Sequence, residues 1–583
     1  MSGKKQTYTD SDRLIVSVSE LDDSSHSRAG HGHDVHRHRL SNKTTLLVTL
    51  SILVTEMCER LTFYSISAGL VLFCTSKLDI KQATATTINQ IFGGFVYLIP
   101  IIGGFVSDSY IGRFRTILIS SCVYIIGTIF LPAAAVEYSD WGWGEISVTG
   151  RTALFGCALV CVALGTGGIK ANVGPFGAEQ ISSLGPEAVQ SFFNWFYWVI
   201  NVGALIAYTV VAAVQQDVSF AWGFFIPLAT MVLALTIFVS VKNKYERTTP
   251  KGSILTVAWK ILVQGTGKRP PHAQAQKFPE GKTLLWKAKK TYGGSFDDEI
   301  VDGVVSVIKV IPFCLLVIMY WAVYSQMNNT FFAQSERMDI RMGDSINIPA
   351  AALNAFNTII IIILIPIVDR LVYPCFQKLG MPLTYLKRIG IGMIFAAASM
   401  VVAGIVEIYR KDGTFHEQTL ADQTFNSSSM SVFVQIPQFA LIGASEIFTS
   451  VTTLEFAYNQ APVAMQGLLT GLFLAASGFG NWVSTAILAI VEEATKSDPW
   501  WGDEINDTKM ENLMFLLAGL MVLNFFIFCI VAHFYTYQDP ATFEKKTPEV
   551  VVEPESQGLE NDSKSYKTFS DPTQTKPRDT TSL

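Results

Sequence analysis

The segment Glu56–Tyr64 reads EMCERLTFY and places three ionisable side chains inside an apolar run from about Thr44 to Phe73. At 100° per residue, Glu56, Glu59 and Arg60 share one helical face, and Glu56 precedes Arg60 by four residues, the favourable order for an ion pair. Each charge at the bilayer centre costs about 3 kcal/mol, so such a group persists only where it is paired and faces a protein interior or a watery cavity. The pattern therefore favours a solute pathway across a membrane.

Two simpler explanations compete with that one: a structural lock between helices, and a core helix of a soluble protein. The composition excludes the soluble protein, because 50% of the residues are hydrophobic and only 16% are charged, and the mean hydropathy is +0.34. Apolar runs of spanning length recur along the whole chain. The formal net charge of -5 gives no reason to invoke nucleic acid.

We expect an all-α membrane protein with about twelve transmembrane helices. The predicted spans start near Thr44, Ala85, Arg115, Thr152, Ala188, Phe220, Val304, Pro349, Leu383, Ser431, Gln466 and Glu511. The connection between spans six and seven is the most basic one, which places it in the cytosol, and both termini with it.

This pattern predicts five segments. They are a disordered cytosolic tail (1–43), an N-terminal six-helix bundle (44–241), a cytosolic linker (242–302), a C-terminal six-helix bundle (303–537) and a second disordered cytosolic tail (538–583).

The two tails carry short peptide signals. Asp10, Leu14 and Ile15 match an acidic dileucine sorting signal, which coat adaptors read, and the end Thr581–Leu583 resembles a ligand of PDZ domains. The histidine cluster His31, His33, His36 and His38 lacks the Cys or carboxylate scaffold of a metal site, so we predict neither a metal nor a cofactor. Both tails are predicted to be solvated and disordered.

The predicted topology places two glycosylation sequons on the non-cytosolic side, at Asn426 and Asn506. The eight cysteines lie in or beside apolar spans and are interpreted as packing residues.

A glycine-rich motif ends the second predicted span. Residues 103–113 read GGFVSDSYIGR and resemble the signature loop of the major facilitator superfamily. Asp108 and Arg113 lie at its cytosolic end, where a charge pair can latch two helices and break during a conformational change. We predict a gating role for both.

Fixed charges of opposite sign separate between the two halves of the chain. Arg60 and Lys170 lie in spans of the first half, whereas Glu446 is the one acid deep in the second half. A cavity with such a charge distribution suits a zwitterion.

Four motifs in the same order resemble the proton-coupled oligopeptide transporter family, and its peptide/histidine transporter branch in particular. They are the Glu56–Tyr64 helix, the run Gly165–Asn172, the run Phe192–Leu205 and the block Glu446–Pro462. The resemblance covers about Thr44 to Tyr537. It implies the major facilitator fold, two six-helix bundles facing each other across a central cavity and working by alternating access.

The resemblance also implies roles for single residues. The proton-coupling group would be Glu56, Glu59, Arg60 and Glu446. Substrate would be bound by Arg60, Tyr64, Tyr97, Lys170, Asn201, Trp321, Asn357, Glu446, Phe473 and Ser477. Lys170 would receive the peptide carboxylate, and Glu446 the peptide amino group.

The chain departs from the family pattern in three places. Gln90 stands where intestinal-type members carry a histidine, the acid that many relatives have shortly after the tryptophan Trp321 is missing, and Phe63 replaces a tyrosine. Coupling would therefore rest on carboxylates.

The implied function is symport of protons with di- and tripeptides into the cytosol, free histidine being a further candidate substrate. The resemblance implies no enzyme and no cofactor other than the proton as coupling ion. The alternatives are a transport-weak scaffold for signalling partners and a plasma-membrane uptake carrier. The dileucine signal and the branch together favour an endosomal or lysosomal membrane.

Overall fold

A computed structural model describes residues 42–142, 144–250, 254–267, 284–342, 346–420, 423–460 and 463–537. Apart from Asn42 and Lys43, which begin the first helix, both predicted tails lie outside the described residues, and with them the sorting residues Asp10, Leu14 and Ile15 and the terminal Thr581–Leu583.

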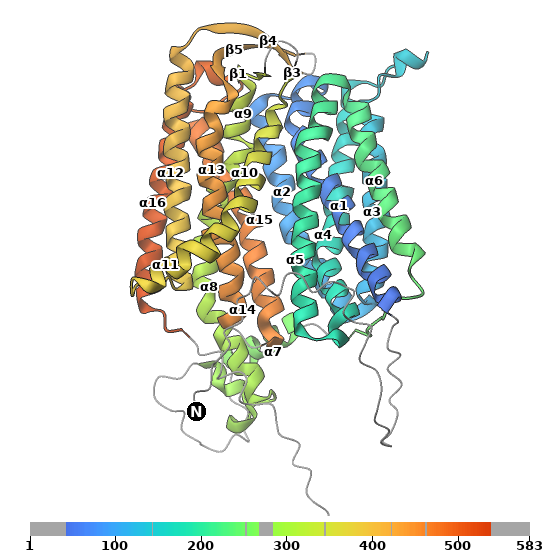
Figure 1. Cartoon of the computed structure of the whole chain (residues 1–583), viewed down its shortest axis with the longest axis vertical. Coiled ribbons are helices and arrows are strands. Elements are labelled where there is room, and N and C mark those ends of the chain that lie inside the picture. Colours follow the sequence, from blue (N-terminus) through green and yellow to red (C-terminus); the bar gives the residue numbers. More distant parts are fainter. Residues whose placement is uncertain are drawn as a thin grey trace, which may run out of the picture.

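Two helical bundles lie side by side (Figure 1). The N-terminal bundle consists of α1 (Asn42–Lys77), α2 (Gln82–Val106), α3 (Arg113–Ala135), α4 (Val148–Ile181), α5 (Pro186–Ile206) and α6 (Phe220–Ser240). The C-terminal bundle consists of α8 (Asp298–Tyr324), α9 (Thr330–Glu336), α10 (Leu353–Ile367), α11 (Tyr373–Lys378), α12 (Tyr385–Asp412), α13 (Ile436–Glu446), α14 (Thr452–Gln460), α15 (Val463–Ala494) and α16 (Met510–Phe534). The short helix α7 (Ile254–Thr266) lies in the connection between them.

The spans confirm a membrane protein of the expected helical class. Among the described residues, 11 helical segments are long and apolar enough to cross a membrane, and α1 is not one of them. This helix has 36 residues, which is long enough to span a bilayer, and it carries the buried Glu56, Glu59 and Arg60. It packs against α2, α4, α5 and α6 and completes the N-terminal bundle.

A small sheet covers one end of the C-terminal bundle and adds to the predicted helices. Strand β5 (Gln423–Ser431) pairs antiparallel with β4 (Phe415–Leu420) and parallel with β1 (Met338–Asp339). The hairpin forms because alternate residues of β4 are buried, as in a strand with one face on the protein. A separate ribbon joins β2 (Arg341–Met342) and β3 (Ile346–Asn347). We call this end of the molecule the sheet end, and the opposite end, where α1 begins and α16 ends, the tail end (Figure 1).

Polar side chains join the two bundles at the sheet end. Gln82 donates a hydrogen bond from Nε2 to Oε2 of Glu336 at 3.1 Å, and Gln423 donates one to the carbonyl oxygen of Thr75 at 2.5 Å. Further bonds across the same interface join Lys81 to Asp503, Gln90 to Ser484, and Gln216 to the backbone of Ala350. The bundles are therefore closed against each other at this end.

Two glycines bring α2 and α15 into close contact about halfway along their length. A Cβ atom added at Gly478 would lie 2.8 Å from the carbonyl oxygen of Gly94, and one added at Gly94 would overlap the Trp482 ring. Only glycine allows the two backbones to approach this closely.

Candidate solute and proton site

Three charged side chains form a buried cluster in the middle of α1. Glu56, Glu59 and Arg60 are only 3%, 0% and 4% exposed. Arg60 donates from Nε to Oε2 of Glu59 at 2.5 Å, and the same nitrogen lies 3.2 Å from Oε1 of Glu56. The remaining oxygens, Oε2 of Glu56 and Oε1 of Glu59, have no hydrogen-bond partner. Each carboxylate thus has one oxygen available to a proton or a ligand.

A glycine on α5 makes room for this cluster. A Cβ atom at Gly203 would lie 2.8 Å from the carbonyl oxygen of Met57 and 3.3 Å from Cβ of Arg60. The Asn-x-Gly in the Phe192–Leu205 run therefore has a packing reason, since α5 meets α1 at the turn that carries Arg60.

Lys170 of α4 adds a second positive charge. Its Nζ atom is buried, has no hydrogen-bond partner and lies 3.2 Å from the centre of the Tyr97 ring on α2. It interacts electrostatically with Arg60, Glu59 and Glu56. An ammonium that lies on an aromatic face and makes no hydrogen bond still has hydrogen bonds to offer, as a binding site for an anionic group would require.

Glu446 is the acidic centre of the C-terminal bundle. Its Oε2 atom accepts a hydrogen bond from the hydroxyl of Tyr324 at 2.6 Å and another from Nδ2 of Asn357 at 3.3 Å. Helix α13 ends at Glu446 and continues as a π-turn over Ile447–Val451. Such turns interrupt the regular ladder and are frequent at functional sites.

The acidic centre faces tyrosines of the N-terminal bundle. Glu446 interacts electrostatically with Tyr64, Tyr97 and Tyr208. The rings of Tyr64 and Tyr208 lie 5.5 Å apart. These tyrosines line the seam between the negative centre and the positive centre, so the two bundles contribute opposite charges to one region.

The remaining predicted binding residues have other surroundings. Asn201 donates its amide to the carbonyl oxygen of Tyr197, one turn earlier in its own helix, at 2.8 Å. Trp321 packs its ring against Tyr324, 5.0 Å between centres. Phe473 and Ser477 of α15 are buried at 4% and 2% exposure.

The predicted gating residues contact each other loosely. Arg113 lies 3.7 Å from Asp108, and it makes a closer ion pair with Glu179 at the end of α4. Thr248, in the loop after α6, also donates to Glu179. These contacts tie elements of the N-terminal bundle together, and Glu179 is the partner that sequence reasoning missed.

Gln90, one of the three positions where the sequence departs from the family pattern, takes part in a group of neutral hydrogen bonds between the bundles. Gln90 and Gln326 each donate a hydrogen bond from Nε2 to the hydroxyl of Ser484, both at 2.7 Å. Thr485 donates to Oε1 of Gln90 at 2.7 Å. We call Gln90, Gln326 and Ser484 the amide hub.

Sequence reasoning also missed Tyr324 and Tyr208. Tyr324 lies three residues after Trp321, and that spacing places both on one face of α8. Tyr208 follows the glycine of the Asn-x-Gly by five residues and carries no such signal. No cluster of three or more His, Cys, Asp or Glu side chains that could hold a metal occurs within the described ranges.

Two packed helical bundles with buried charges of both signs at their seam define a multi-pass membrane transporter of the major facilitator fold. The family model described as "PTR2: POT family" matches residues 114–508. The chain therefore belongs to the POT family, whose members are transporters and not enzymes.

Individual relatives agree with this assignment. The chain is 34% identical to "Protein NRT1/ PTR FAMILY 8.1" of Arabidopsis thaliana, over 84% of this chain and 93% of the relative. It is 31% identical to "Solute carrier family 15 member 3" of Mus musculus, over 84% of this chain and 92% of the relative. The crystal structure of the POT family transporter PepTSo superposes with a TM-score of 0.66 at 25% identity, covering 83% of this chain and 97% of that one.

Proposed function

We propose that this protein is a proton-coupled symporter that carries di- and tripeptides toward the cytosol by alternating access, with free histidine as a further candidate substrate. One observation carries the proposal: fixed charges of opposite sign stand in opposite bundles, Lys170 in one and Glu446 in the other. A short peptide is a zwitterion whose two ends match these charges. Membership of the POT family supports the same substrate class.

Proton coupling in this proposal rests on the α1 cluster. Glu56 and Glu59 share one cation, Arg60, and each retains an oxygen without a hydrogen bond. Two cations, Arg60 and Lys170, balance the two carboxylates. A peptide carboxylate that pairs with Lys170 therefore leaves one buried negative charge without compensation, and a proton can restore the balance. Binding or loss of the peptide carboxylate near Arg60 and Lys170 would change that balance.

The primary experiment is uptake of a labelled dipeptide into proteoliposomes under an imposed pH gradient. We expect accumulation that depends on the gradient and collapses when a protonophore is added. Uptake of no peptide under any gradient would contradict the proposal and favour the scaffold alternative.

Single-residue variants test the zwitterion clamp. Glu446→Gln should weaken the binding of peptides with a free amino end and spare amino-blocked analogues. Lys170→Gln should weaken the binding of peptides with a free carboxylate and spare carboxyl-blocked analogues. Each lost charge-assisted hydrogen bond corresponds to about 1.5–3 kcal/mol, or roughly tenfold to a hundredfold in affinity.

Matched controls are Glu493→Gln and Lys309→Gln, which remove exposed charges of the same types. Equal losses for every ligand in both site variants would assign Glu446 and Lys170 to folding or gating instead.

We further propose that the protein works in an endosomal or lysosomal membrane, where an acidic lumen supplies protons. Replacing Leu14 and Ile15 with alanine should move a tagged protein to the cell surface. Surface residence of the unmodified protein would contradict this location and favour the plasma-membrane alternative.

For glycosylation we propose Asn426 as the main acceptor. Its side chain is exposed on β5, whereas the amide of Asn506 accepts from Arg410 at 2.6 Å and donates to the backbone of Asn426 at 2.8 Å. A glycosidase-sensitive shift in mobility should disappear in Asn426→Gln. A shift lost only in Asn506→Gln would contradict this choice.

A further inference from the structure

One acidic side chain stands where the bundles close, away from the solute site. Glu336 is the last residue of α9, at the sheet end, and is 0% exposed. Its Oε2 atom accepts the hydrogen bond from Gln82 of α2 across the bundle interface at 3.1 Å. Its Oε1 atom is buried and has no hydrogen-bond partner. Closure of the sheet end therefore removes a carboxyl group from water.

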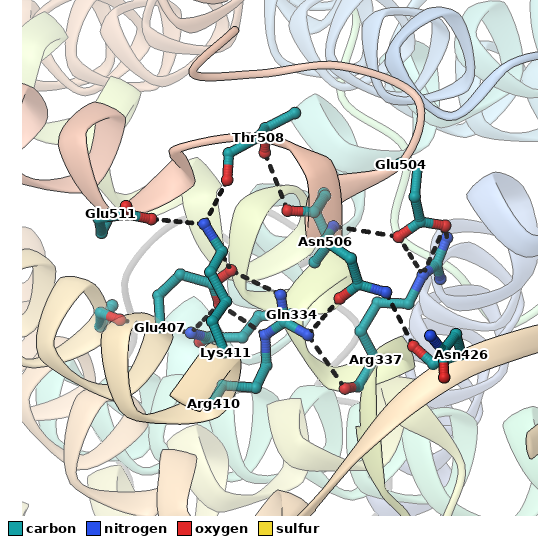
Figure 2. Close-up of polar contacts among 12 residues, drawn as sticks. Gln334, Arg337, Glu407, Arg410, Lys411, Asn426, Glu504, Asn506, Thr508 and Glu511 are labelled. Carbon is teal, nitrogen blue, oxygen red and sulfur yellow. Dashed lines mark hydrogen bonds and ion pairs between the residues drawn. The ribbon is translucent and has the colours of Figure 1, made fainter. Parts of the chain in front are cut away.

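The neighbouring charges do not fully compensate an ionised Glu336. The nearest cation is Arg337, whose Nη1 atom lies 3.8 Å from Oε2 of Glu336. Arg337 is already used by a second carboxylate, since its Nε donates to Glu504 at 3.1 Å and its Nη2 donates to the same group at 3.3 Å (Figure 2). Lys81, beside Gln82, pairs with Asp503 at 2.9 Å.

Glu504 also acts on Glu336, because the negative charge of Glu504 disfavours a negative charge on Glu336. Figure 2 shows Glu504 directed at Arg337, and Arg410 held between Glu407, Asn506 and the backbone of Arg337. Arg410 is therefore paired with Glu407, and Arg337 is shared between Glu504 and Glu336.

Deeper along the same seam the contacts are neutral. Gln82 and Gln90 both lie on α2, eight residues or about 12 Å apart. Glu336 and Gln326 lie in one span of the other bundle, Asp298–Glu336. The amide hub holds Gln90 to Gln326 through Ser484, so its bonds form equally well at any pH, whereas the buried contact between Gln82 and Glu336 includes a carboxyl group that can respond to acid.

Elementary electrostatics sets the direction of that response. An ionised carboxylate that leaves water without a full partner costs several kcal/mol, whereas a neutral carboxylic acid costs much less and keeps both a donor and an acceptor for Gln82. When the bundles part, water can solvate the charged form.

We propose that Glu336 is a proton-operated latch at the sheet end: it takes a proton from the water on that side before the bundles close over it, and returns the proton to the same side when they part. This inference rests on the proposed function as a transporter and deepens it. The proton at Glu336 does not cross the membrane, so the latch controls how fast the protein closes at a given pH and leaves the proton-to-peptide ratio to the α1 cluster.

Peptide exchange separates these two quantities. In proteoliposomes with the same pH on both sides, exchange of labelled for unlabelled dipeptide by the wild type should slow as the pH rises from acidic to neutral. Glu336→Gln, which mimics the protonated side chain, should exchange at a rate that depends less on pH than the wild-type rate does, and about tenfold faster than wild type at neutral pH, a factor that corresponds to 1.4 kcal/mol. Gradient-driven accumulation should reach the same final level in both.

The matched control is Glu504→Gln, which removes the other carboxylate of Arg337 and leaves Glu336 in place. It should retain a pH-dependent exchange rate. An unchanged pH dependence in Glu336→Gln, or an equal loss of pH dependence in Glu504→Gln, would overturn the proposal.

A distance measurement keeps the test independent of transport. Spin labels at Val218 and Glu417, exposed positions of the two bundles at the sheet end, can be attached after the exposed cysteines Cys122, Cys157, Cys375 and Cys529 are replaced by serine. We expect short distances in acid and a longer population at neutral pH in the wild type, and short distances at both pH values in Glu336→Gln.

The outcomes remain distinguishable. A wild type that shows no uptake but a pH-dependent distance would contradict the transport function and keep the latch. If Glu336→Gln fails to fold, the wild-type distances decide alone, because closure that ignores pH would overturn the latch.

Discussion

Two buried clusters of ionisable side chains differ in whether all their carboxylate oxygens accept hydrogen bonds. At the sheet end, Glu407 and Arg410 are both 0% exposed, and both oxygens of Glu407 accept bonds: Oε1 from Arg410 at 2.7 Å, and Oε2 from Arg410 at 2.8 Å and from Gln334 at 2.9 Å (Figure 2). In α1, Glu56 and Glu59 each keep an oxygen without a partner. A satisfied cluster holds one structure, whereas an incomplete one can bind something further.

The largest effect should come from breaking the complete cluster. Arg410→Met leaves Glu407 buried with its main partner gone, which costs about 3–5 kcal/mol of folding free energy. We expect a marked drop in the unfolding temperature of the detergent-solubilised protein. The double variant Glu407→Gln with Arg410→Met should recover part of the loss, and a single variant as stable as the wild type would remove the distinction between the clusters.

A smaller change in stability, with a larger change in function, should follow from neutralising the incomplete cluster. Glu59→Gln keeps the shape of the side chain and removes a charge that has one free oxygen, so stability should change by about 1 kcal/mol. Gradient-driven uptake should fall about tenfold while exchange at equal pH persists, since the loss affects coupling more than binding. With Glu493→Gln as the control, a parallel fall of both activities would show that Glu59 acts in binding or folding.

The smallest effect concerns an exposed carboxylate outside the membrane spans. The backbone amide of Ser139 donates to Glu145 at 2.7 Å, and Arg151 donates to it at 2.6 Å. The backbone and side-chain hydrogen bonds of Ser139, followed by that of Arg151, lower the pKa of Glu145 from 4.5 to about 2. Because the folded pKa is depressed, the stabilising contribution is complete above pH 4.5 and is lost as the pH falls toward 2.

The loop around Glu145 should therefore stay ordered in an acidic compartment. Amide hydrogen exchange in residues 138–142 and 144–151 should be slower in the wild type than in Glu145→Gln, and the difference between the two proteins should be the same at neutral pH and at about pH 5. Equal exchange in the wild type and in Glu145→Gln at pH 5 would contradict the depressed pKa of Glu145.

Local periodicity explains how much of the fold and site could be predicted from the sequence. The spans and the α1 face that carries Glu56, Glu59 and Arg60 follow from hydropathy and the helical repeat. The three-residue spacing of Glu407 and Arg410 was equally readable, yet their charges lie near the end of a span, where solvent exposure is the ordinary expectation. Their burial against Gln334, the backbone of Arg337 and Asn506, which lie far away in the sequence and which no helical period encodes, decides their role.

Contacts between elements far apart in the chain could not be predicted. Tyr324 reaches Glu446 across 122 positions, and Gln82 reaches Glu336 across 254. Sequence places Glu336 at the end of an apolar run, which indicates a charge near water. Its burial follows from the approach of the other bundle.

The close contact of Gly94 and Gly478 has a mechanical consequence. When two rigid bodies rock against each other, the point where their backbones touch moves least and acts as a fulcrum. Side chains at the sheet end lie about half a helix length from this contact, so a small tilt about these glycines moves Gln82 away from Glu336. A methyl group at either glycine would push the two helices apart at this contact. It would change how far the sheet end opens without altering a charged side chain.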